Sequence, residues 1–305
     1  EINNIKRLIL NDLTLFKLPN QFENFKECEE LDLSNNEFKE FPQVLYSLAN
    51  LKILYFNANE FDTISSEIIK MDSLETLHIQ DYDCLININS NLFRLQNLRE
   101  LNLAFDYLLF ENDDFFAYSV YSDNQIYTEN ESNDPTNFVS YTFLKKLIIS
   151  NNSLDMFPKN FTNFFNLEEL DISNNFFEEI PYEIHSFTNL EILNISFNNI
   201  ANIIIKNGMF TKLLKLYLQC NRITELSISD NTLQSLKTLD LSCNNLPKLD
   251  KNIFQLKRLK KLIVVGVIFT EIEKFPYIKH DPISLILTIK NINVLSNIFC
   301  YNGNI

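Results

Sequence analysis

Apolar residues recur every 23 positions along almost the whole chain of 305 residues. Units of this length can be started at thirteen points, and only the step from Leu74 to Leu98 is 24 residues long. The fourth position of a unit is leucine in twelve of the thirteen units, with Asn124 as the exception. A fixed period of this length predicts a solenoid of stacked, similar turns. The units start at Ile5, Cys28, Leu51, Leu74, Leu98, Tyr121, Leu144, Leu167, Leu190, Leu213, Leu236, Leu259 and Pro282.

Each unit also contains a short alternating pattern. Its fourth and sixth positions are apolar, as in Leu31 and Leu33, whereas the positions beside them are mostly polar. This period of two predicts a short strand that buries the apolar pair and exposes its neighbours. Because one turn cannot bury its apolar face alone, neighbouring turns must stack on it, and their strands form a parallel sheet.

The unit that starts at Leu167 reads LEELDISNNFFEEIPYEIHSFTN and resembles the leucine-rich repeat, written L-x-x-L-x-L-x-x-N-x-L. Its 23-residue length and its apolar-Pro step resemble the short, typical repeats of intracellular leucine-rich scaffold proteins. The resemblance implies a single α/β solenoid over residues 1–305, a right-handed horseshoe of about 12–13 repeats. It would carry a parallel β-sheet on the concave face and short helical or 3-10 turns on the convex face. The apolar-Pro steps are Leu18-Pro19, Phe41-Pro42, Phe157-Pro158 and Ile180-Pro181.

The ninth position of seven units is asparagine. An inward amide there can satisfy the backbone N–H and C=O groups of adjacent turns, which must be paired when buried. We therefore predict a structural role for these asparagines rather than a ligand-binding one. They are Asn36, Asn59, Asn152, Asn175, Asn198, Asn221 and Asn244.

The resemblance also implies that partners bind the concave face, so the outward positions of the strands are candidate protein-binding residues. Aromatic side chains flanked by carboxylates are typical of interface anchors with a polar rim. Single exposed aromatics are also ordinary surface residues, which is the alternative interpretation. The candidates are Asp32, Tyr55, His78, Phe105, Asp171, Phe197, Tyr217 and Asp240.

The last two units carry apolar residues at the outward positions, namely Ile263, Val265, Ile286 and Ile289. A solenoid end without a polar face needs a cap or a docking partner. The sequence therefore predicts that residues 283–305 contact another copy of the chain and form a homo-oligomer. The alternative is that residues 289–305 fold back as an apolar cap.

A second irregular region lies between Glu100 and Leu144, where nine acidic residues and no Lys or Arg occur. Its length of two periods predicts a degenerate repeat over residues 109–143, with an acidic, aromatic loop at about residues 122–133 in place of the strand. The loop is either a solvated excursion or a docking segment for a basic partner.

Charge and composition exclude several classes of function. The chain has a formal net charge of −14, which disfavours binding to nucleic acid or to an anionic membrane surface. Three scattered glycines cannot form a glycine-rich phosphate loop. The longest apolar run, Leu262 to Phe269, is far shorter than the roughly 20 residues of a membrane-spanning helix, so we expect no membrane insertion.

The sequence predicts no catalytic, cofactor-binding or metal-binding residues. His78, His185 and His280 fall on different parts of the expected solenoid, and no metalloprotease, nucleophile-elbow or paired-cysteine motif occurs. Cys220 and Cys243 occupy the same position of adjacent turns, at a separation compatible with a disulfide. We favour free thiols there and keep the disulfide as the alternative.

These observations predict a non-enzymatic module for protein–protein interaction or assembly, with a protein partner, no nucleic acid and no cofactor. The alternative is a regulatory domain of a larger, multidomain enzyme, since leucine-rich arrays can be fused to catalytic domains. The chain starts at Glu1 without Met, which favours secretion after removal of a signal peptide. Missing cysteine-rich flanking caps favour the cytoplasm instead.

Overall fold

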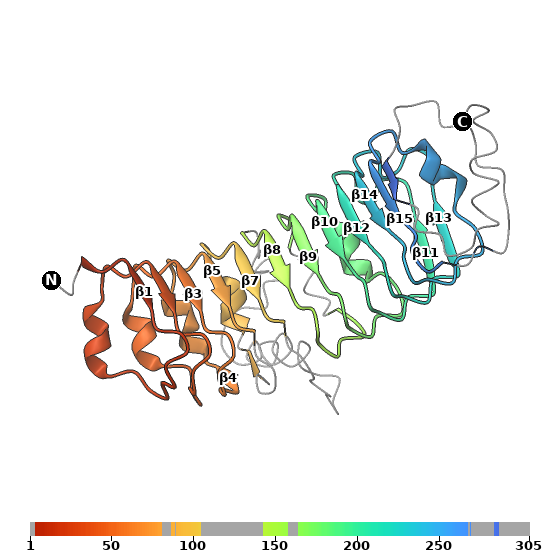
Figure 1. Cartoon of the computed structure of the whole chain (residues 1–305). Helices are drawn as coiled ribbons and strands as arrows, with labels where there is room; N and C mark the ends of the chain where they lie inside the picture. Colours follow the sequence, from red (N-terminus) through yellow and green to blue (C-terminus); the bar gives the residue numbers. More distant parts are fainter. Residues whose placement is uncertain are drawn as a thin grey trace, which may run out of the picture. The chain divides into compact units, whose positions relative to one another are not determined.

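The computed structural model describes residues 4–80, 87–88, 90–104, 143–157, 164–267, 269 and 284–286 (Figure 1). The chain forms two compact units. Unit 1 contains Glu1–Ser153 and Phe157–Leu167, and unit 2 contains Leu154–Met156 and Glu168–Ile305. The acidic loop at 122–133 and nearly all of the degenerate repeat at 109–143 lie outside the described residues, so both stay predictions.

Each unit is built on a parallel sheet of three-residue strands, one from each turn. The described strands of unit 1 follow the order β1 (Arg7–Ile9), β2 (Glu30–Asp32), β3 (Ile53–Tyr55), β5 (Thr76–His78), β7 (Glu100–Asn102) and β8 (Lys146–Ile148). Those of unit 2 follow the order β9 (Glu169–Asp171), β10 (Ile192–Asn194), β12 (Lys215–Tyr217), β14 (Thr238–Asp240), β15 (Lys261–Ile263) and β16 (Ser284–Ile286).

The central residue of every one of these strands is a predicted fourth-position leucine. Neighbouring strands pair in register, so Leu8 lies beside Leu31 and Leu193 lies beside Leu216. β7 pairs directly with β8 through Leu101 and Leu147, although these leucines are two periods apart in the sequence. From Leu31 to Leu262, each described central leucine is at most 1% exposed. The predicted leucine-rich repeat solenoid with a parallel sheet is confirmed.

Short 3-10 helices return the chain on the other side of the core, as the repeat predicts. Three of them follow Pro19, Pro42 or Pro181, which suits proline because its fixed φ begins a helix and its missing N–H would have no partner there. The helices are η2 (Asn20–Asn24), η3 (Gln43–Ser47), η4 (Ser66–Lys70), η5 (Ser90–Arg94), η7 (Tyr182–Ser186) and η8 (Lys251–Gln255). Two further pairs of parallel strands are β4 (Thr63–Ile64) with β6 (Asn87–Ile88), and β11 (Asn202–Ile205) with β13 (Glu225–Ile228).

The seven ninth-position asparagines are all buried, at 3–7% exposure. Asn198 shows the arrangement. Its Nδ2 donates to the carbonyl oxygens of Ile172 and Ile195 at 3.1 and 3.2 Å, and its Oδ1 accepts the N–H of Phe177 at 3.0 Å. One amide therefore satisfies the backbone of its own turn and of the preceding turn. The predicted structural role of the asparagines is confirmed.

The eighth position of each described turn adopts a left-handed backbone, and in seven of these turns it directly precedes a buried asparagine. The φ values of eight non-glycine residues lie between 50° and 57°, and Gly266 has φ 72°. Asn and Asp tolerate this region, whereas other residues with a Cβ are strained there by about 1–2 kcal/mol. The non-glycine residues are Asp12, Asn35, Ala58, Asn151, Asn174, Phe197, Cys220 and Cys243.

The seven buried ninth-position asparagines form what we call the asparagine ladder. Replacing one of them is expected to destabilise the fold. In Asn244→Ala, the buried N–H of Ile223 loses its acceptor at 3.0 Å and the carbonyl of Leu218 loses its donor at 2.9 Å. We expect the free energy of unfolding to fall by about 2–4 kcal/mol, measured by chemical denaturation. The matched control is Asn245→Ala, because Asn245 is exposed and should change stability by no more than about 0.5 kcal/mol. Equal effects of the two variants would contradict the role of the ladder.

Glycine at the left-handed position is expected to stabilise the fold. Ala58 has φ 50°, and Ala58→Gly removes the clash of its Cβ with the backbone. We expect a gain of about 0.5–1 kcal/mol in unfolding free energy, once the larger backbone entropy of glycine in the unfolded chain is included. Ala201→Gly serves as the control, since Ala201 has no positive φ and the same change there should lower stability.

Candidate interaction surface

The sheet of each unit presents the first and third residues of its strands on the face opposite the core. In most strands these two residues are half-buried around a fully buried leucine. In unit 1 the register places the predicted residues Asp32, Tyr55 and His78 side by side on β2, β3 and β5. The rings of Tyr55 and His78 meet edge to face, with centroids 5.1 Å apart. The structure therefore brings these three candidates together.

His78 is held by a polar cluster that includes residues the sequence did not single out. Its Nε2 lies 3.1 Å from Glu100 Oε1, and Lys146 Nζ lies 3.0 Å from the same oxygen. Burial raises the pKa of Glu100, but Lys146 and His78 outweigh this effect and the pKa is lowered overall. The sequence could have predicted this cluster, because His78, Glu100 and Lys146 occupy outward strand positions of successive described turns. The imidazole is oriented by its neighbours before any partner arrives.

The three candidate aspartates also have a local structural role. Asp32, Asp171 and Asp240 each accept the N–H of a serine two residues later, at 2.9 Å. This is an Asx turn, which ends the strand. The D-x-S pattern could have revealed it in the sequence. One carboxylate oxygen of each aspartate is therefore committed to the fold, and the Oδ2 of Asp171 also accepts the amide of Asn194 at 2.9 Å.

In unit 2 the most exposed of the aromatic candidates is Phe197. Its side chain is 53% exposed, and its backbone is left-handed with φ 55°. Tyr217 lies on β12, half-buried, in register with Asn194 on one side and Asp240 on the other. Phe105, the equivalent candidate in the β7 turn, lies outside the described residues.

The predicted oligomer contact is only partly described. Ile263 at the end of β15 and Val265, two residues later in the chain, are half-buried. Ile286 pairs with Ile263 through β16, and Ile289 lies outside the described residues. The homo-oligomer at this end stays a prediction.

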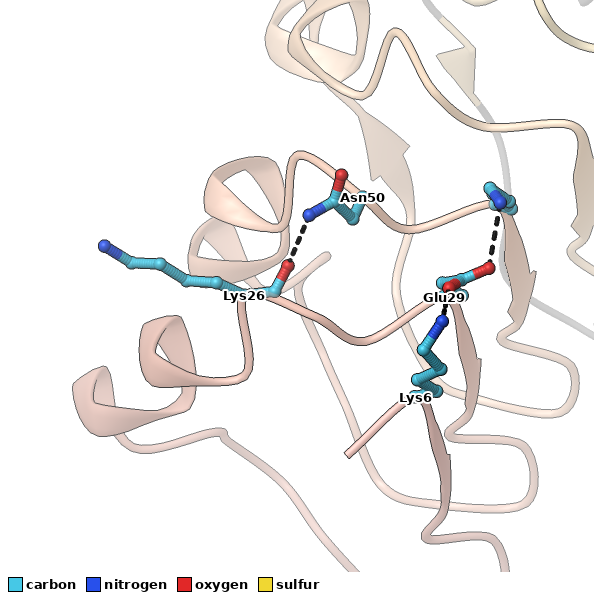
Figure 2. A network of polar contacts seen from close by, with 5 residues as sticks. Lys6, Lys26, Glu29 and Asn50 are labelled. Atoms are coloured by element: carbon cyan, nitrogen blue, oxygen red, sulfur yellow. Dashed lines mark hydrogen bonds and ion pairs between the residues drawn. The ribbon is translucent and has the colours of Figure 1, made fainter. Parts of the chain in front are cut away.

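Ion pairs run across the turns of unit 1 at the position just before each strand. Glu29 stands between two lysines, with Lys6 Nζ at 2.7 Å and Lys52 Nζ at 2.8 Å from its carboxylate oxygens (Figure 2). Hydrogen bonds and charge from Lys52 and Lys6 lower the pKa of Glu29 to about 2. In the same figure the Asn50 amide donates to the carbonyl of Lys26 at 2.9 Å and ties the two turns together. Residues 23 apart at this position therefore touch.

The described residues contain no group of three or more His, Cys, Asp or Glu side chains placed to hold a metal ion. Cys220 and Cys243 are free thiols on adjacent turns. Burial, and then the neighbouring Cys243, raise the pKa of Cys220. No helix in the described ranges has the length and apolar character needed to cross a membrane.

Two family models match segments in the second half of the chain. The model of leucine-rich repeats in two copies matches residues 165–207, and the model of a single leucine-rich repeat matches residues 235–256. Adenylate cyclase of Schizosaccharomyces pombe is 31% identical over 104 residues, which is 34% of this chain and 6% of the cyclase. The match thus spans only a small part of the length of that relative.

Solved structures share the fold at low sequence identity. A leucine-rich repeat protein of Leptospira interrogans has a TM-score of 0.59 and 23% identity, and the match covers 90% of this chain and 75% of that chain. The octameric complex of latrophilin 3, Unc5D and FLRT2, in which FLRT2 is the leucine-rich repeat component, gives a TM-score of 0.64 and 21% identity, with coverage of 87% and 82%. The register of the strands, the buried asparagines and these matches together show that the chain folds as a leucine-rich repeat solenoid, with leucine-rich repeats matched at residues 165–207 and 235–256.

Proposed function

We propose that the chain is a non-enzymatic module that binds a protein partner on the exposed face of its sheets, with Phe197 as an anchor. The observation that supports this most directly is the conformation of Phe197. A phenylalanine here is strained by its left-handed backbone and leaves 53% of its surface in water. The preceding turn uses Asn174 at the same position without that strain. A residue that is costly to the fold and exposed is best explained by contact with a partner.

The surroundings of Phe197 suit a protein interface. Phe197 follows β10 in the chain, and the register of β9, β10, β12 and β14 aligns Asp171, Asn194, Tyr217 and Asp240 on one face of the sheet, so these strands add an aromatic ring and polar groups. Interfaces commonly combine aromatic anchors with a polar rim of this kind. The complex that contains FLRT2 supports a protein as the class of partner, because a leucine-rich repeat chain assembles there with other proteins.

A second candidate function is regulation of a catalytic domain in a larger protein. The match to a 104-residue part of the fission yeast adenylate cyclase favours it. The chain would then bind a regulator or position the enzyme, and its own role would still be recognition. Sequencing the full transcript tests this candidate: a downstream catalytic domain in frame would support it, and its absence would contradict it.

The proposed anchor can be tested by site-specific photo-crosslinking. We expect p-benzoylphenylalanine in place of Phe197 to give a discrete crosslinked protein in an extract of the native cells. The same group in place of Tyr182, an aromatic that is 75% exposed on η7, should give none. Equal crosslinking from both positions would contradict a specific surface.

The variant Phe197→Asn separates binding from stability. Asparagine is better suited to the left-handed backbone, so the free energy of unfolding should stay constant or rise by up to about 1 kcal/mol. Capture of the crosslinked partner should fall at least about tenfold, as for other aromatic anchors. A variant that loses stability, or that retains full capture, would contradict the assignment.

A further inference from the structure

Two cysteines occupy adjacent turns of unit 2 at the left-handed eighth position. Cys220 has φ 56° and Cys243 has φ 53°. This backbone region favours Gly, Asn and Asp, so each cysteine is strained there, as Phe197 is. Among the described eighth positions, cysteine occurs only in these two neighbouring turns. Because the unfavourable residue occurs as an adjacent pair, its role is best sought in the pair.

The backbones of the two turns run in register up to the cysteines. Tyr217 of β12 lies beside Asp240 of β14, three residues before each cysteine. The N–H of Cys220 donates to the carbonyl of Ser242 at 2.9 Å, so the pairing continues to the residue before Cys243. Adjacent parallel strands lie about 4.8 Å apart, and the Cα atoms of a disulfide lie about 4.4–6.8 Å apart. Two cysteines in this register, with the same backbone conformation, are placed for a bridge.

Gly266, at the eighth position of the next turn, shows how closely such side chains approach. A Cβ at Gly266 would lie 3.4 Å from Cys243 Sγ and 3.9 Å from Cys243 Cα. The same hydrogen bond recurs between these two turns, from the N–H of Cys243 to the carbonyl of Val265 at 2.7 Å. A Cβ at an eighth position is therefore in contact with a thiol of the preceding turn. The equivalent pair one turn earlier is Cys243 and Cys220.

The two thiols differ in their access to solvent. Cys243 is exposed, and the equivalent position of the next turn is Gly266, which has no side chain to cover it. Cys220 is half-buried. Burial raises the pKa of the Cys220 thiol, and the nearby Cys243 thiol raises it further. An oxidant therefore reaches Cys243 first, and Cys220 is placed to react with the product.

We propose that Cys220 and Cys243 form a redox-active dithiol, which hydrogen peroxide converts reversibly into a disulfide across the two turns. The Cys243 thiolate attacks the peroxide, so that the O–O bond breaks, an S–O bond forms and hydroxide leaves. The Cys220 thiol then attacks the sulfenic acid sulfur, the S–S bond forms and water leaves. Overall the two thiols lose two electrons and two protons, and the peroxide is reduced to water.

The position of the pair favours reversal of the reaction. Exposed disulfides are among those most easily reduced, so an external dithiol should restore both thiols without unfolding the chain. The proposal goes beyond the proposed function and uses no binding partner. Loss of the Phe197 anchor would leave it intact, and its own failure would leave the anchor intact.

Peptide mapping of the oxidised full chain identifies the bridge. Trypsin cleaves on both sides of each cysteine and releases Cys220 and Cys243 on separate peptides, 216–222 and 238–248. The reduced, folded chain is treated with hydrogen peroxide, alkylated and digested without reductant. We expect mass spectrometry to find the two peptides as one linked species, which dithiothreitol separates. Recovery of the peptides unlinked, or linked to a different cysteine, overturns the proposal.

Two controls accompany this map. Cys28 is fully buried, and burial raises the pKa of its thiol, so its peptide should stay unoxidised and be alkylated only after unfolding. Oxidation of a mixture of isotope-labelled and unlabelled chains tests whether the bridge lies within one chain. We expect linked peptides that are both labelled or both unlabelled. Linked peptides of mixed labelling, formed as often as the unmixed ones, would overturn a bridge between adjacent turns of one chain.

Single variants test the order of the two steps. In Cys220→Ser the sulfenic acid on Cys243 has no thiol to react with, so dimedone should label it at least about fivefold more than in the wild-type chain. Cys243→Ser should be labelled at least about fivefold less than Cys220→Ser, because its remaining thiol is half-buried. Equal labelling of the wild-type chain and Cys220→Ser would contradict the role of Cys220. Thermal unfolding by circular dichroism verifies that both variants are folded.

Discussion

The structure depends on the need to satisfy buried backbone groups at a fixed interval along the chain. A turn of 23 residues contains only a three-residue strand, so its hydrogen bonds must come from the next turn and from a side chain of the correct shape. The buried asparagine provides this, because it has both a donor and an acceptor at its end and can serve two turns at once. The buried leucines then fill the space that the ladder encloses, and each contributes roughly 1.5–3 kcal/mol. The hydrogen bonds of the buried asparagines thus fix how successive turns align, and the leucines pack in the space that this alignment leaves.

This constraint explains why the sequence predicted the fold well and the surface less well. Leucine at the fourth position and asparagine at the ninth can each be recognised from a single residue. Their positions agree with the strands and with the buried asparagines wherever the chain is described. The roles of Asp32, Asp171 and Asp240 were incomplete, because an outward aspartate looks like a contact residue until its bond to the serine N–H is seen. The ion pairs of Glu29 were readable in principle from the 23-residue interval.

Other features could not be read from single residues. The left-handed backbone at the eighth position is suggested by Asn35 or Asn174, but Phe197, Cys220 and Cys243 give no such signal. Their strain becomes visible only when the turns are superimposed on one register. The direct pairing of β7 with β8 was also hidden, since the sequence between Leu101 and Leu147 has the length of two turns. In both cases the neighbouring turns override the local preference of the residue, as is general for short elements in a tertiary context.

The same register aligns the equivalent surface residues of successive turns in columns across the sheet. Most columns follow a repeating pattern of residue types, so residues involved in function are best sought where a column departs from that pattern. A column can reduce its electrostatic energy by alternating charge, as Lys6, Glu29 and Lys52 do, or it can accumulate one sign, as Lys237 and Lys260 do. It can use Asn at a left-handed position, or it can hold Phe197 there under strain. Both the like-charged lysines and the strained phenylalanine are unfavourable for the isolated fold, and both leave side chains that can contact a partner. Because leucine-rich repeats are so regular, these unfavourable choices stand out from the structural background, and they carry more information about recognition than exposure alone.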